Sequence, residues 1–175
     1  YFVEQRCRPK VRSLWFCGAS RTRVSATVSR AIFDASRAII ICPSNPYLSI
    51  EPILSIPGLR AALIQATAPV IAVSPIIGGQ AVKGPTAKIM SELGTPVNNV
   101  SIAAHYRGLI DGLVIDALDA YEQAAIDIPV HATCTLMQDL ADRIHLGREV
   151  LAFADRLATS RLRVVSRNAP AGMIA

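Results

Sequence analysis

The fold is decided by residues 38–52, AIIICPSNPYLSIEP, and residues 70–86, VIAVSPIIGGQAVKGPT. Each stretch opens with a short apolar run rich in β-branched side chains, which is typical of a strand buried on both faces of a parallel sheet. Each run leads into a loop that carries proline or glycine and then into a helical pattern. Strands that alternate with helices in this way predict a parallel sheet.

The rest of the chain continues the alternation. Ser25 is expected to cap the first helix, and Gly94 to end the third. Residues 1–3 and 14–16 have the pattern of short strands outside the main sheet. The predicted helices cover residues 24–35, 58–66, 86–93, 98–106 and 139–157, and the further strands cover 113–115 and 129–132. We therefore expect an α/β fold: a Rossmann-like open parallel sheet with helices on both faces.

Composition limits the domain organisation. The chain has 175 residues, of which 51% are hydrophobic, enough for one compact domain. We assign residues 1–158 to a single α/β domain and residues 159–175 to a basic tail that is disordered or peripheral. The apolar runs are far shorter than the roughly 20 residues of a membrane-spanning helix, so no membrane contact is expected.

The positive charge does not have the pattern of a nucleic-acid surface. The formal net charge is +5, but residues 38–155 alone carry −5, while residues 1–37 carry +6 and residues 156–175 carry +4. The basic flanks lack the interleaved aromatic side chains that stack on bases. We interpret them as solvated or interface faces and expect no nucleic-acid partner.

The cysteines point to no metal site. The four of them form no C-x-x-C pair, and Cys42, which closes an apolar run, reads as a small core residue. No basic-then-apolar leader follows Tyr1, so we expect a cytoplasmic protein without disulfides.

The first loop offers short polar side chains where ligands bind in open parallel sheets, beyond the carboxyl ends of the strands. These are Ser44, Asn45 and Ser49. Ser49 is expected to cap a helix whose first turn contains Pro52. The loop fits either an anion site at a helix start or simply a rigid, capped turn.

The second loop leaves the strand at 70–73 and begins with Ser74. Gly78 and Gly79 would let the backbone approach a ligand, and Lys83 supplies a positive charge. Gly84-Pro85 reads as the N-cap and first residue of a helix. The order of a Walker A loop is absent. Two such loops on consecutive strands nevertheless favour a phosphate ligand.

Other candidate residues are weaker. Asp116 lies at the carboxyl end of a strand, where it could contact a metal or a ribose, whereas Asp119 fits a helix cap equally well. His105 lies near a helix C-terminus, where cationic side chains are favoured anyway. His131 and Cys134 have the spacing of a partial metal clip without a second pair.

Taken together, these motifs resemble the CofD family. The motifs are Pro43-Ser44-Asn45-Pro46, Val73-Ser74-Pro75-Ile76 with Gly78-Gly79, Lys83-Gly84-Pro85, Asp111-Gly112 and Asp116. The resemblance runs from residue 1 to residue 157. It implies a 2-phospho-L-lactate or phosphoenolpyruvate transferase of coenzyme F420 biosynthesis. Such an enzyme transfers a 2-phospholactate or phosphoenolpyruvate-type group from a guanosine-diphospho donor to the hydroxyl of the deazaflavin Fo. It uses Mg²⁺ and releases GMP.

The resemblance also implies which residues bind. The nucleotide-phosphate site would comprise Ser44, Asn45, Ser49, Ser74, Gly78, Gly79 and Lys83. Family members are roughly twice this long as single α/β units, so we expect the chain to correspond to their C-terminal half. The metal and Fo ligands, apart from the weak candidate Asp116, are expected in the other half. The chain alone is expected to be inactive, and the full-length protein to be a homodimer.

Two residues depart from the family pattern, and two alternative functions stay open. Glu51 stands where the family pattern has Gly or Asp, and Cys134 where it has Asp, which would weaken a polar contact in the site. One alternative is a non-catalytic nucleotide or UDP-sugar binding protein, although such proteins carry a Gly-Pro-Gly-Ser loop. The other is an inactive, truncated remnant.

Overall fold

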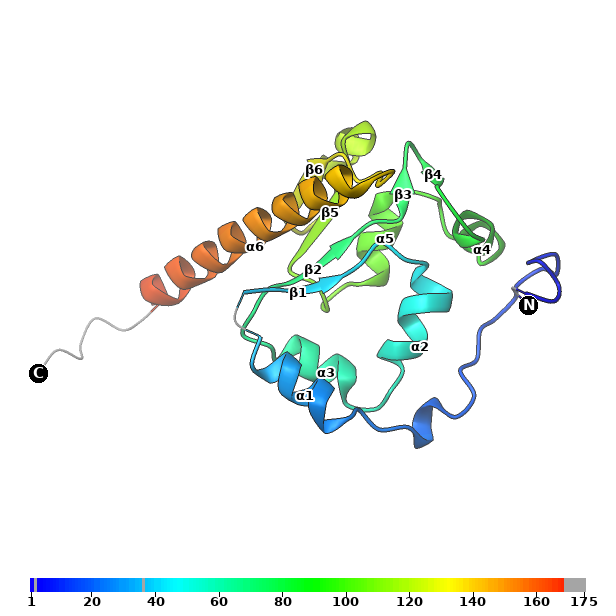
Figure 1. Ribbon diagram of the computed structural model, residues 1–175, viewed down its shortest axis with the longest axis horizontal. Coiled ribbons are helices and arrows are strands. Elements are labelled where there is room, and N and C mark those ends of the chain that lie inside the picture. Colours follow the sequence, from blue (N-terminus) through cyan, green and yellow to red (C-terminus); the bar gives the residue numbers. More distant parts are fainter. Residues whose placement is uncertain (2, 36, 169–175) are drawn as a thin grey trace, which may run out of the picture.

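The core of the protein is a four-stranded parallel sheet. The computed structural model describes residues 1, 3–35 and 37–168 (Figure 1). Its main sheet has the strand order β1-β2-β5-β6, and every neighbouring pair is parallel. The strands are β1 (Ile39–Ile41), β2 (Val70–Val73), β5 (Gly112–Asp116) and β6 (Val130–Thr133). This sheet confirms the predicted α/β fold.

Helices cover both faces of this sheet, as predicted. In Figure 1, α6 runs along one face, and α1 and α3 lie beyond the other. The helices are α1 (Ala26–Phe33), α2 (Glu51–Leu54), α3 (Leu59–Ile64), α4 (Thr86–Glu92), α5 (Asn99–His105) and α6 (Leu140–Asn168). Ser25 caps α1 by accepting a hydrogen bond from the Val28 N–H, and Gly94 follows the end of α4 with a φ of +73°.

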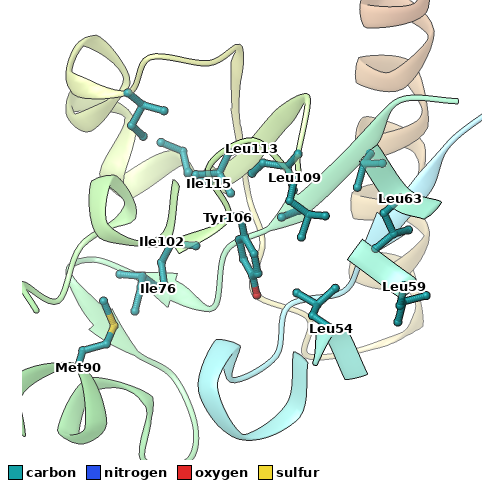
Figure 2. Close-up of a cluster of buried hydrophobic side chains, with 14 residues drawn as sticks. Leu54, Leu59, Leu63, Ile76, Met90, Ile102, Tyr106, Leu109, Leu113 and Ile115 are labelled. Carbon is teal, nitrogen blue, oxygen red and sulfur yellow. The ribbon is translucent and has the colours of Figure 1, made fainter. Parts of the chain in front are cut away.

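The larger core lies on the face opposite α6. Tyr106 is buried at its centre, among leucines and isoleucines from the sheet and from α2, α3 and α5 (Figure 2). Burial raises the pKa of the Tyr106 phenol. The strands β2 and β5 contribute fully buried side chains to this core, which explains their continuous apolar sequence.

The second core lies under α6. There Ile71, Val73 and Val114 of the sheet pack against Leu146, Val150, Phe153 and Ala154 of the helix. Gly112 permits this packing, because a Cβ at that position would lie 2.7 Å from the Phe153 ring. The close approach of α6 to β5 therefore depends on a residue without a side chain.

The α6 helix is longer than its apolar stripe predicted. It continues to Asn168, past the expected end at Leu157, and its outer part projects beyond the body of the protein (Figure 1). The division of the chain at residue 158 stays a prediction, and residues 169–175 lie outside the described part. Among the described helices, none combines the length and the hydropathy needed to cross a membrane.

Two sequence expectations at the edge of the sheet are wrong. The run at 38–42 is not buried on both faces, because Ile40 is 39% exposed, and Cys42 is exposed rather than in the core. The reason is position: β1 lies at the end of the strand order and pairs with β2 alone among the described strands.

The short strand expected at 14–16 is also wrong, and the one expected at 1–3 includes residue 2, which lies outside the described residues. The described residues among the first 25 form turns and the 3-10 helix η1 (Ala19–Arg21). They attach to α4 rather than to a strand. The Val11 N–H donates to the Glu92 carboxylate at 2.8 Å, and the Lys88 ammonium donates to the Pro9 carbonyl at 2.9 Å. These two hydrogen bonds therefore hold the N-terminal segment against α4.

Candidate functional site

A pocket opens at the carboxyl ends of the strands, where the sequence predicted a site. Its volume is about 640 Å³. Three segments form its walls: residues 43–49 after β1, residues 74–86 after β2, and residues 135–137 after β6. The structure thus brings together the two loops that were singled out from the sequence and adds a third.

The first wall is organised by Asn45. Its side-chain Oδ1 accepts hydrogen bonds from the N–H groups of Tyr47 at 2.9 Å and Leu48 at 3.0 Å. Asn45 thereby caps a π-helical turn, η2 (Pro46–Ile50), that runs directly into α2. The predicted cap, Ser49, is wrong, because Pro46 at the first helical position places the helix start four residues earlier. Ser49 instead lines the pocket.

The second wall contains a small hairpin that was missed. Strands β3 (Ile76–Ile77) and β4 (Gln80–Ala81) are antiparallel, and Gly78 and Gly79 join them with φ of +58° and +70°. Two positive φ angles in a two-residue turn are the requirement of the type I′ hairpin. The signal in the sequence was the Gly-Gly pair between short apolar runs.

This hairpin is fixed by Asp119 of the 3-10 helix η3 (Ala117–Ala125). Its carboxylate accepts hydrogen bonds from the N–H groups of Gly78 and Gly79, each at 2.9 Å, and is fully buried. Asp119 is therefore not the cap of its own helix, which was one of the sequence expectations. The cap is Asp116, which accepts a hydrogen bond from the Leu118 N–H.

Five of the seven predicted site residues line the pocket, namely Ser44, Asn45, Ser49, Ser74 and Lys83. Gly78 and Gly79 do not, and their N–H groups are engaged by Asp119. Ser74 is buried, and its hydroxyl accepts a hydrogen bond from the Ile76 N–H at 3.1 Å. Lys83 is exposed and is the one charged side chain among the described residues that line the pocket.

The start of α4 differs slightly from the prediction. Pro85, not Gly84, occupies the N-cap position, and Gly84 has a φ of +71°. The shift by one residue arises because Gly84 takes the left-handed turn that directs the chain into the helix. Thr86, the first residue of α4, is buried and lines the pocket.

The third wall was not among the predicted binding residues, although the resemblance placed the neighbouring Cys134 at the site. It consists of Thr135, Leu136 and Met137, which follow β6. Asp116, at the carboxyl end of the neighbouring strand, accepts hydrogen bonds from the Thr135 N–H at 2.8 Å and hydroxyl at 3.0 Å. The signal was topological: β6 pairs with β5, so its carboxyl end lies at the same edge of the sheet.

The histidines do not form a metal site in the described part of the chain. Nε2 of His131 lies 2.7 Å from the Glu149 carboxylate and Nδ1 lies 3.2 Å from Arg156, while Cys134 is exposed. The His131 contact lowers the pKa of Glu149. No group of three or more His, Cys, Asp or Glu side chains suited to a metal occurs among these residues. His131 and Cys134 therefore do not form the partial metal-binding pair that their spacing suggested.

His105 lies in a different environment from the surface helix end expected for it. Its ring packs edge-on against Tyr47 and Tyr106, with centroid separations of 5.0 Å in both cases. Burial lowers the pKa of His105, and the nearby Glu51 carboxylate opposes this effect. Glu51 in turn accepts two hydrogen bonds from Arg60, at 2.9 and 3.0 Å.

The pocket lining combines polar and apolar side chains. Its polar groups are hydroxyls, the Asn45 amide and the Lys83 ammonium, and the described lining includes no carboxylate. Its apolar side chains are Leu48, Ile77, Val82, Leu136 and Met137. Such a lining suits an anionic group attached to an apolar or planar one.

Comparison with known proteins agrees with this arrangement. The family model for 2-phospho-L-lactate transferase CofD matches residues 1–151. A 2-phospho-L-lactate transferase of Methanococcus maripaludis is 35% identical over 153 residues, which are 87% of this chain and 48% of the relative. A phosphoenolpyruvate transferase of Streptomyces griseus is 32% identical over 161 residues, which are 90% of this chain and 50% of the relative.

These matches establish the family. The chain belongs to the CofD family of 2-phospho-L-lactate transferases, as its loop motifs indicated. A further relative, the 2-phospho-L-lactate transferase of Methanosarcina mazei, is 37% identical over 127 residues, 73% of this chain and 41% of the relative. The chain spans about half the length of the curated relatives that it matches.

Proposed function

We propose that this chain supplies part of the nucleotide-diphosphate site of a transferase. In the complete reaction, the hydroxyl of the deazaflavin Fo attacks the phosphorus of a phospholactyl or phosphoenolpyruvyl group carried by a guanosine-diphospho donor. The bond from that phosphorus to the GMP oxygen breaks, and GMP leaves. The product belongs to coenzyme F420 biosynthesis. The names of the relatives cover both donor acids, so the proposal includes both.

One observation carries the proposal: the two loops that bear the family motifs meet in a single pocket with a positive side chain in its lining. Lys83 lies in the same lining as Ser44 and Asn45, although 38 residues separate Asn45 from Lys83 in the sequence. A lysine beside hydroxyl and amide donors attracts phosphate oxygens. In this role the chain binds and orients the diphosphate, so that the leaving GMP stays fixed while the acceptor attacks.

Magnesium is included in the proposal only because the family resemblance implies it. Asp116 does not fit as its ligand, because it is buried, does not line the pocket and directs its carboxylate at the N–H groups of Leu118 and Thr135. Mg²⁺ prefers several oxygen ligands together, and the pocket lining has no carboxylate among the described residues. We propose that the metal, which would neutralise phosphate charge, is held by the donor's phosphates and by protein outside this chain.

The proposal is tested by calorimetric titration of GDP into the protein. GDP should bind, and Lys83→Ala should weaken binding about 10-fold through loss of a charge-assisted contact. Arg107→Ala removes the same charge from an exposed position outside the pocket and should leave the affinity unchanged. UDP in place of GDP distinguishes a binder of uridine nucleotides from the proposed guanosine specificity.

Two results would contradict the proposal. If Lys83→Ala and Arg107→Ala bind GDP as tightly as the native sequence does, the pocket is not the nucleotide site. If UDP binds more tightly than GDP, the site resembles a UDP-sugar binding protein rather than a guanosine-diphospho transferase.

A further inference from the structure

A cluster of charged and aromatic side chains lies behind the first wall of the pocket. Arg60 of α3 forms an ion pair with Glu51 of α2, in which Nη2 of Arg60 donates to both carboxylate oxygens, and Nε2 of His105 lies 3.4 Å from the same carboxylate. None of these three residues lines the pocket. Arg60, Glu51 and His105, here called the rear cluster, are thus separate from the proposed binding residues.

The rear cluster connects to the pocket through a single helical turn. The His105 ring packs edge-on against Tyr47 at 5.0 Å, and Tyr47 is the second residue of η2. Glu51 directly follows the last residue of this turn. The cluster therefore holds η2 at both its beginning and its end. A π-helical turn is a rare geometry that is frequent at functional sites, and its contacts with the rear cluster stabilise it.

At the front of this turn, the amide of Asn45 has a fixed orientation. Its Oδ1 accepts from the N–H groups of Tyr47 and Leu48, and the reversed amide would direct its NH₂ at those two donors. Nδ2 of Asn45 therefore takes no part in the contacts with this turn. It is buried and has no hydrogen-bond partner among the described residues, although Asn45 lines the pocket. A buried donor without a partner is costly, so this turn needs stabilising contacts elsewhere.

We propose that Arg60, Glu51 and His105 are positioning residues, which hold η2 so that the wall it contributes to the pocket keeps the arrangement that binds an anionic ligand. The identity of that ligand as a nucleoside diphosphate rests on the proposed function, whereas the positioning does not. The proposal also explains why Glu51, a departure from the family pattern, suits this position, because its longer side chain reaches both Arg60 and His105.

The test uses Arg60→Met, which removes the charge and both hydrogen bonds while keeping an extended side chain. The matched control is Arg37→Met, which breaks another Arg–carboxylate ion pair, in which Nη2 and Nε of Arg37 donate to Asp155 at 3.0 and 3.2 Å. By calorimetry, Arg60→Met should weaken GDP binding about 5-fold, the scale of coupling through a positioning element. Arg37→Met should not change it, and Arg60→Lys should bind with intermediate affinity.

A second readout needs no ligand. Amide hydrogen exchange at Tyr47 and Leu48 should accelerate about 5-fold in Arg60→Met, while exchange in β2 and β5 stays as in the native protein. This pattern separates a loosened turn from a general loss of stability. Arg37→Met should leave exchange at Tyr47 and Leu48 unchanged.

The outcomes separate the two proposals. If the native protein does not bind GDP, the proposed function fails, and hydrogen exchange alone decides the positioning. Unchanged exchange at Tyr47 and Leu48 in Arg60→Met overturns the positioning. Faster exchange with an unchanged GDP affinity overturns the role of η2 in ligand binding. Faster exchange with weaker GDP binding supports both.

Discussion

Hydrogen bonds between Asp116 and Thr135 connect strand β5, in the middle of the sheet, to the third wall of the pocket. The carboxylate of Asp116, at the end of β5, accepts hydrogen bonds from both the N–H and the hydroxyl of Thr135, which begins the third wall. Both residues are buried. The position of this wall is therefore set by a residue that does not itself line the pocket.

Replacing Asp116 should disturb the wall rather than a metal. In Asp116→Asn, one carboxylate oxygen is replaced by an NH₂ group, so at least one of the three N–H and O–H donors that face it is left unpaired. We expect a loss of about 1–3 kcal/mol in the free energy of unfolding. GDP affinity should fall about 5-fold, equally with Mg²⁺ and with EDTA. A loss of affinity that appears only with Mg²⁺ would show instead that Asp116 binds the metal.

Gly112 should be intolerant of a side chain. In Gly112→Ala the new Cβ would meet the Phe153 ring at 2.7 Å and Leu157 at 2.8 Å, so α6 must shift away from β5. Overpacking of this kind costs about 1–3 kcal/mol, which thermal unfolding measures directly. Gly147→Ala is the matched control, because a Cβ there meets nothing within 4 Å. Equal stabilities of the two variants would contradict the described packing of α6.

Asp119 should be essential for the β3–β4 hairpin. Asp119→Ala leaves the Gly78 and Gly79 N–H groups without their acceptor, at a cost of about 2–3 kcal/mol. Chemical denaturation measures this loss, with the exposed Asp127→Ala as the control. If Asp119→Ala and Asp127→Ala unfold at the same denaturant concentration, the carboxylate does not hold the turn.

His105 should make stability depend on pH. Burial keeps its folded pKa below the ordinary value of 6.5. As the pH falls through 6.5, the unfolded chain therefore binds a proton that the folded chain resists, and the free energy of unfolding decreases. The decrease ends once the pH is below the folded pKa. His105→Gln should lack this component, which is seen by subtracting its stability profile from that of the native protein. Identical slopes between pH 7 and 5 would contradict the burial of His105.

The fold was largely predictable because its strands are continuous apolar runs. The runs at 70–73 and 113–115 became fully buried central strands, as their β-branched residues indicated. The identical pattern at 38–42 became an edge strand with exposed Ile40 and Cys42, since a local run of isoleucines does not reveal the strand order. The helix over 139–157 was found by its apolar stripe, whereas its continuation to Asn168 was not predicted.

The candidate site was predictable only in part. Ser44, Asn45, Ser49, Ser74 and Lys83 share one pocket because parallel strands place their following loops at one edge of the sheet. The contacts of Asp119 with Gly78 and Gly79 span about 40 residues, and those of Asp116 with Thr135 span 19. Partners that far apart leave no periodic signal in a single sequence. The rear cluster was missed for the same reason, since Glu51, Arg60 and His105 come from three helices or their ends.

The most direct measurement of the central claim is an NMR titration of the isotopically labelled protein with GDP. If the pocket binds the nucleotide, the backbone amides of residues 44–45, 47–49, 83–84, 86 and 135–137 should shift together as GDP is added, and they should saturate at one concentration. Amides around His131 and Glu149, on the α6 side of β6, should not move. Shifts confined to that other side, or no shifts at millimolar GDP, would contradict the assignment of this pocket as the nucleotide-diphosphate site.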